Sequence, residues 1–136
     1  MKTFSKVKYR FNFQGHREIL GDHKTTLEFT KDSFLTKRGN CIIGVKADFE
    51  VDDLKKFLGF KKIKIKIIVA KLDDELVAVP NKTFNDNHEI VIRIGEFISP
   101  RTFAVNATKA SINIDRNVIK ALKDDKAKGI VEIEGI

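Results

Sequence analysis

Apolar residues recur at every second position in three segments, and this alternation constrains the fold more than any other feature. The segments are 7–13, 62–69 and 90–94. Successive side chains of a β-strand point to opposite faces, so each segment predicts a strand with one buried face and one wet face. Weaker strand patterns cover 19–20, 24–30, 41–47, 75–79, 101–106 and 130–134.

Two short segments have the spacing of helices instead. The first is expected to open at Asp52-Asp53, where acidic side chains meet the positive end of the helix dipole, and to stop at a left-handed Gly59. Asp115 is expected to cap the second. We therefore predict a mainly β protein, with residues 1–136 forming one domain. It is a sandwich or jelly-roll-like barrel of about eight strands with two short helices.

Composition narrows the functional classes. The 136 residues carry a net charge of +7, and residues 1–71 alone hold 17 Lys/Arg against 8 Asp/Glu. Such a chain attracts anions, although a solvated lysine-rich surface is the simpler explanation. A single cysteine excludes an internal disulfide. No apolar run reaches the roughly 18 residues of a membrane span, and the first residues do not form a secretory signal. We therefore expect a cytoplasmic protein.

Several short stretches resemble a family of small archaeal proteins known as a domain of unknown function. They are TLEFTKD at 26–32, LTKRG at 35–39 and CIIGV at 41–45. The resemblance implies a mainly β fold and an archaeal, intracellular origin, but no activity. Members of that family often carry Asp before the cysteine, where this chain has Asn40.

The region 15–48 gathers polar residues of unusually varied chemistry. The candidate cluster is His16, His23, Thr25, Glu28, Asn40, Cys41 and Asp48. A thiolate at Cys41 would need His23 as its base, which requires pairing of the strands at 24–30 and 41–47. The spacing of the histidines and Glu28 matches no metal motif, so no metal and no cofactor is predicted. Alternatively, these residues are separate turn formers, caps and ion pairs.

Four cations are candidates for binding an anion: Arg38, Arg93, Arg101 and Lys109. Arg93 lies in an apolar strand, where an unpaired guanidinium would be costly. A structural ion pair with Asp48 or Glu28 is the simpler explanation, and an anion pocket is the functional one.

A row of lysines on one predicted strand suggests contact with nucleic acid. Lys62, Lys64 and Lys66 project from one side at intervals of roughly 7 Å, close to the spacing of phosphates in an extended strand. Single-strand binding also needs exposed aromatic residues, and most phenylalanines occupy apparent core positions. The alternative is an edge strand whose lysines discourage aggregation.

From these features we predict a non-enzymatic binding module for an anionic ligand or nucleic acid. The alternative is a small enzyme or metal-binding protein with a polar site built from 15–48. A homodimer is possible, because exposed strand edges permit pairing.

Overall fold

A computed structural model describes residues 7–35 and 39–136. Its strands are β1 (Lys8–Gln14), β2 (Thr26–Thr30), β3 (Ile42–Gly44), β4 (Ile63–Val69), β5 (Leu72–Pro80), β6 (Glu89–Arg93), β7 (Thr102–Val105) and β8 (Lys128–Gly135). The helices are α1 (Val51–Lys55) and α2 (Arg116–Leu122), with a 3₁₀ turn, η1, at Ser111–Asn113. The prediction of a mainly β sandwich or barrel is confirmed.

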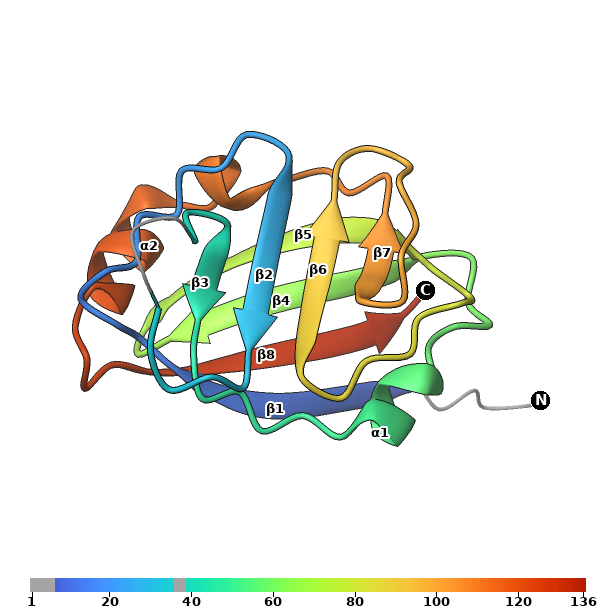
Figure 1. The fold of residues 1–136 in the computed structure, drawn as a ribbon, viewed down its shortest axis with the longest axis horizontal. Coiled ribbons are helices and arrows are strands. Elements are labelled where there is room, and N and C mark those ends of the chain that lie inside the picture. Colours follow the sequence, from blue (N-terminus) through green and yellow to red (C-terminus); the bar gives the residue numbers. More distant parts are fainter. Residues whose placement is uncertain (1–6, 36–38) are drawn as a thin grey trace.

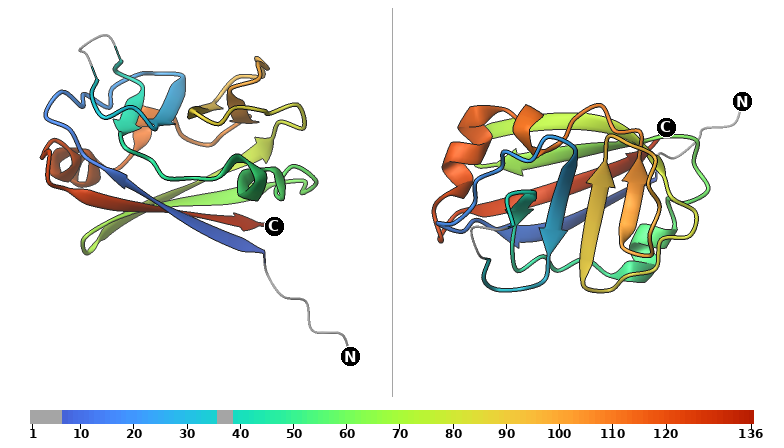
Figure 2. Two further views of the ribbon diagram at one scale, coloured as in Figure 1. Left: turned by 60° about the horizontal axis from the view of Figure 1, so that its bottom comes forward. Right: turned by 45° about the horizontal axis from the view of Figure 1, so that its top comes forward.

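The strands form one continuous order that folds back on itself: β1-β8-β4-β5-β7-β6-β2-β3. We call β1, β8, β4 and β5 sheet A, and β5, β7, β6, β2 and β3 sheet B. Figure 1 shows β7, β6, β2 and β3 in front of the long strands of sheet A, and Figure 2 shows the two layers from other sides. Because β5 pairs with both β4 and β7, it belongs to both sheets and joins the two layers.

The two ends of the strand order meet, so the sandwich closes into a flattened barrel. Gln14 of β1 exchanges two backbone hydrogen bonds with Val45, of 2.8 and 2.9 Å. Asp48 then pairs with Asn12, but the two residues between turn away from β1. The amides of Lys46 and Ala47 donate instead to Asp32 and Thr30. This two-residue bulge holds Lys46 at a φ of 51°, which is unusual for a residue with a Cβ atom.

The alternating apolar residues fill the space between the layers. Ile63, Ile65 and Ile67 of β4 are 0–1% exposed, while the lysines between them are partly exposed. On the sheet B side, Leu27 and Phe29 of β2 are fully buried. Phe13 and Phe29 pack edge-to-face with ring centroids 5.0 Å apart. This geometry is favourable for aromatic pairs and ties β1 to β2 across the core.

Some local predictions differ from the structure. Ile19 and Leu20 form no strand, although Ile19 is buried. Helix α1 begins one residue before Asp52, and Gly59 does not have the left-handed φ expected of a helix stop. Asp115 does cap α2, with its carboxylate accepting a 2.8 Å hydrogen bond from the Asn117 amide.

Candidate functional site

The outer face of sheet B, which points away from the core, carries an unusual row of sheltered polar side chains. In β2, Leu27 and Phe29 point inward, so Thr26, Glu28 and Thr30 point outward. The register places Thr26 opposite Arg93, Glu28 opposite Val91, and Thr30 opposite Glu89 of β6. Although they face outward, the three β2 side chains are at most 7% exposed. An outward polar row that is screened from water is typical of a functional surface.

Glu28 is the most perturbed acid in this row. It is 4% exposed, and burial raises its pKa to about 7, aided by the negative charge of Glu89. Nη1 of Arg101 lies 3.5 Å from Oε1 of Glu28 and 3.0 Å from Oε1 of Glu89. This guanidinium opposes the rise in pKa, but it is shared between the two carboxylates. Glu28 therefore exchanges its proton near neutral pH, as a group in a binding or acid–base site does. We call Glu28 and Glu89 the carboxyl pair.

Arg93 lies on the same face, two residues beyond Val91, which is the register partner of Glu28. Its Nε donates a 3.1 Å hydrogen bond to Oγ1 of Thr102, and its guanidinium carbon lies 5.0 Å from the ring centroid of Phe97. Among the residues that the structure describes, no carboxylate oxygen lies within ion-pair distance of Arg93. The expected ion pair with Asp48 or Glu28 is therefore not formed, although the Arg93 charge does lower the pKa of Glu28.

A hollow of about 180 Å³ surrounds this arginine. We call it the Arg93 pocket. Its walls are Thr25, Thr26, Arg93, Gly95, Glu96 and Phe97. Ile94, Phe97 and Ile98 are 38%, 66% and 54% exposed, so the connection that follows β6 gives the pocket an apolar lip. A cation inside a small hollow beside an aromatic ring is suited to an anion with an apolar part.

Cys41 and His23 border the same face but do not form a nucleophile and base. Nδ1 of His23 lies 3.1 Å from the amides of Thr25 and Thr26 and 3.0 Å from Oγ1 of Thr26. Burial, together with the negative charge of Glu28, raises the pKa of the Cys41 thiol. A raised pKa keeps the thiol protonated at neutral pH, which disfavours the Cys–His enzyme considered from the sequence.

The remaining members of the predicted polar cluster lie elsewhere. Asp48 accepts hydrogen bonds of 2.6 and 3.0 Å from the amide and side chain of Asn12, at the closure of the barrel. His16 lines a separate hollow beside the end of β1. The Asn40 side chain donates to Asp22. The cluster is thus divided: His23, Thr25, Glu28 and Cys41 gather on sheet B, and the others do not.

The four predicted anion-binding cations also separate. Arg93 lies in a pocket, and Arg101 is paired with the carboxyl pair. Lys109 forms an ion pair with Asp74, which also accepts the amide of Asp115. Lys109 therefore anchors the segment before α2 to β5. Arg38 lies outside the described residues.

The predicted lysine row lies among carboxylates on the outer face of sheet A. Lys64 is 3.7 Å from Glu75, and Lys66 is 4.0 Å from Asp73. In the register with β8, the same lysines stand opposite Glu134 and Glu132. Lys62 precedes β4 and is exposed. Opposite charges on neighbouring strands make a ladder of weak cross-strand pairs. Few of these lysines are therefore free to contact a phosphate backbone. Nucleic-acid binding at this face stays a prediction.

No group of three His, Cys, Asp or Glu side chains suited to holding a metal ion occurs within residues 7–35 and 39–136. In the same part of the chain, no helix is long and apolar enough to cross a membrane.

Comparison with known proteins agrees with the resemblance seen in the sequence. The model of a family described as "Domain of unknown function (DUF371)" matches residues 11–135. The chain belongs to the DUF371 family. It is 38% identical over 127 residues to "Uncharacterized protein MJ0206" of Methanocaldococcus jannaschii, an alignment that covers 88% of this chain and 94% of that protein. The match to DUF371 spans both sheets and both helices, so the Arg93 pocket and the carboxyl pair lie within the family's domain.

The sequence did not point to several residues of this site. Glu89 and Thr102 enter it because β6 pairs with β2, which is far away in the chain, on one side and with β7 on the other. The sequence pattern that could have indicated them is the alternation in β6, which puts Glu89 and Arg93 on the same face of the strand. Phe97 is an exposed aromatic in a loop, and no periodic pattern marks it.

Proposed function

We propose that this protein binds a small anionic ligand on the outer face of sheet B, with Arg93 as the main cationic contact. The observation that carries the proposal is the environment of Arg93. Arg93 lines a hollow of about 180 Å³, and Thr102 is the one hydrogen-bond partner of its guanidinium among the described residues. Arginine offers five N–H donors in a planar fork, so most of its capacity to bind a carboxylate or phosphate is available.

Three of the other walls suit the same ligand, whereas the carboxylate of Glu96 would repel it. Thr25 and Thr26 bring hydroxyl groups to the hollow, and Phe97 offers an exposed ring. The volume is below the roughly 300–1,000 Å³ of sites for drug-sized molecules, so a compact ligand is favoured over a large cofactor. The cytoplasm, where we expect the protein to reside, is rich in such anions.

Glu28 gives the site a dependence on pH. When ionised, its carboxylate repels an anion at Arg93; when protonated, it neither repels the anion nor competes for the guanidinium. Because its pKa is raised to about 7, lowering the pH from 8 to 6 neutralises much of this charge. Binding is therefore expected to strengthen over that interval.

Titration with benzoate and inorganic phosphate, followed by NMR shifts of the β2 and β6 amides, tests the proposal. Arg93→Gln removes the charge but keeps a side chain that can reach Thr102. Since a hydrogen bond to a charged group contributes about 1.5–3 kcal/mol, we expect at least about tenfold weaker binding. Arg10→Gln is the matched control, because Arg10 is an exposed arginine on β1 paired with Glu132.

Arg10→Gln is expected to bind both probes as the wild type does. If neither probe shifts the β2 and β6 amides of the wild type at millimolar concentration, or if Arg93→Gln binds equally well, the proposal is wrong. Phosphate changes its own charge between pH 6 and pH 8 but benzoate does not, so equal binding of benzoate at these two pH values would show that Glu28 does not act on the ligand.

The raised pKa of Glu28 also favours a second candidate, an enzyme that uses acid–base chemistry. A carboxyl group that exchanges its proton near neutral pH can act as general acid or base toward a molecule held by Arg93. The carboxyl pair, with Arg101 between its members, would then set the protonation state of Glu28. This candidate rests on the same pocket and differs in predicting that the ligand is converted.

A further inference from the structure

Another hollow lies at the barrel closure, away from the Arg93 pocket. It measures about 330 Å³ and is lined by Asn12, Phe13, Gln14, Lys46, Asp48 and Lys128. It forms where the chain leaves β1 at the two-residue bulge and rejoins it at Asp48. A bulge at a barrel rim re-aims side chains, and here it turns Lys46 outward.

The backbone of Lys46 shows that this orientation is imposed. Its φ of 51° places the Cβ atom in a conformation that is unfavourable for any residue except glycine, asparagine or aspartate. The amide hydrogen bond from Lys46 to Asp32 and that from Ala47 to Thr30 hold the bulge in place. The bulge therefore fixes where the Lys46 side chain leaves the backbone.

A second lysine lies on the other side of Gln14. Lys128 of β8 is the register partner of Gln14, whereas Val45, next to Lys46, bridges Gln14 from the opposite side. Among the described residues, neither ammonium group has a carboxylate within ion-pair distance. Lys46 and Lys128 thus line the hollow from the two segments that flank Gln14, each without a carboxylate partner in the described part of the chain.

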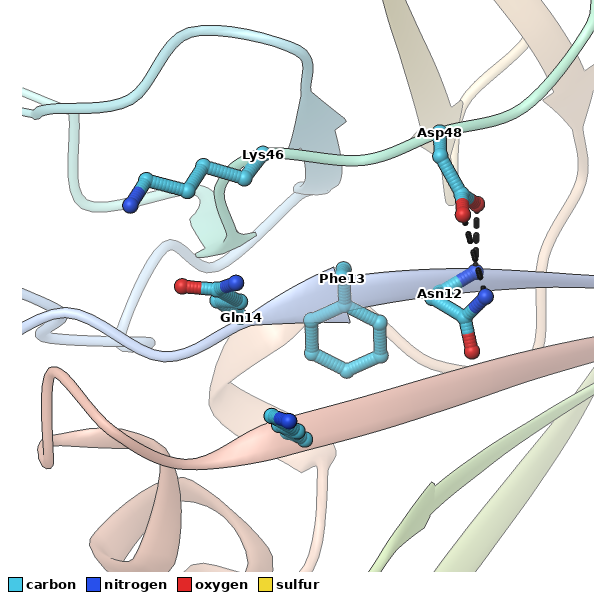
Figure 3. Close-up of a pocket in the computed structure, with 6 residues that line it drawn as sticks. Asn12, Phe13, Gln14, Lys46 and Asp48 are labelled. Atoms are coloured by element: carbon cyan, nitrogen blue, oxygen red, sulfur yellow. Dashed lines mark hydrogen bonds between the residues drawn. The ribbon is translucent and has the colours of Figure 1, made fainter.

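The two ends of the hollow differ. Figure 3 shows Asp48 bound to Asn12 at one end, Lys46 and Gln14 at the other, and Phe13 between them. The Asp48 carboxylate would repel a second negative group but accept hydrogen bonds from hydroxyl groups. A hollow of about 190 Å³ adjoins the lysine end and shares Gln14 and Lys46 with it. A ligand whose charged group lies near the lysines would thus have room for further atoms.

We propose that the barrel closure is a second binding site, for a small phosphate monoester that carries hydroxyl groups. Lys46 and Lys128 bind the phosphate with the Gln14 amide, and the hydroxyl groups face Asn12 and Asp48. The proposal does not depend on the Arg93 pocket, because no residue lines both hollows.

Isothermal titration of the full chain with glycerol 3-phosphate at low ionic strength tests this site. Lys46→Gly removes the charge and suits the φ of 51°, so the variant is expected to fold. We expect Lys46→Gly and Lys128→Gln each to weaken binding about fivefold, since a partly exposed charge pair contributes modestly. Ala70→Gly is the matched control, because Ala70 has a φ of 54° in the turn between β4 and β5.

Wild-type binding that survives in Ala70→Gly and in Arg93→Gln, but weakens in the two lysine variants, supports the proposal. It is overturned if the wild type does not bind glycerol 3-phosphate at millimolar concentration. It is also overturned if Lys46→Gly binds as tightly as the wild type, or if only Arg93→Gln loses binding. The last result would place the phosphate in the Arg93 pocket and leave the proposed function intact.

Discussion

Replacing Glu28 with glutamine is expected to flatten the dependence of stability on pH between pH 5 and pH 8. In the folded protein the Glu28 pKa is raised from 4.5 to about 7, so folding favours the protonated form. The resulting stabilisation is fully present below pH 4.5 and is lost as pH rises through 7. A difference of this size corresponds to about 3 kcal/mol at most. Glu28→Gln keeps the neutral form at every pH and should be more stable than the wild type at pH 8.

Urea unfolding of both proteins at pH 5, 6, 7 and 8 measures this difference. Glu89→Gln should give a smaller slope than the wild type, because the Glu89 charge is the second cause of the raised pKa. Glu96→Gln is the control, since Glu96 is an exposed carboxylate in the connection after β6, and its slope should match the wild type. A wild-type stability that is constant or rises over this range contradicts the predicted burial of Glu28.

The sequence predicts the face of β2 on which Glu28 lies, but not the neighbours of Glu28 on that face. Alternation in β2 correctly separates Glu28 from Leu27 and Phe29, and alternation in β6 correctly sends Arg93 to the face opposite Ile92. Alternation within a strand, however, carries no information about which strands pair. The parallel pair β2–β3 and the antiparallel pair β2–β6 determine the neighbours of Glu28, and both are long-range.

The strand predicted at 24–30 begins two residues later in the structure, and the cause is local. The sequence suggests a strand from 24, but β2 begins at Thr26 because the His23 ring binds the amides of Thr25 and Thr26. A side chain that accepts backbone hydrogen bonds competes with the strand ladder and delays its start. Similarly, the barrel closure depends on a bulge at Lys46. Lysine is not a residue type that predicts a positive φ, so the sequence does not indicate this bulge.

Replacing Gly15 with alanine is expected to destabilise the protein by about 3 kcal/mol or more. Gly15 follows β1, where the chain passes the end of α2. A Cβ atom at this position would lie 2.4 Å from the carbonyl oxygen of Leu122 and 2.5 Å from that of Asp124. Both neighbours are backbone atoms, so no side-chain rotation can relieve the overlap. The hydrogen bonds from Gly15 to Ala127 and from His16 to Leu122, each 2.9 Å, prevent the segments from separating cheaply.

Thermal unfolding provides the measurement, and a loss of this size corresponds to a fall in Tm of roughly 10 °C. Gly59→Ala is the matched control, because no atom lies within 4 Å of the added Cβ and its φ is not left-handed. Its stability should stay within about 0.5 kcal/mol of the wild type. Since the segment after Gly15 also lines the hollow beside Lys46, equal Tm values for the two alanine variants would contradict the close approach of Gly15 to the end of α2 beside that hollow.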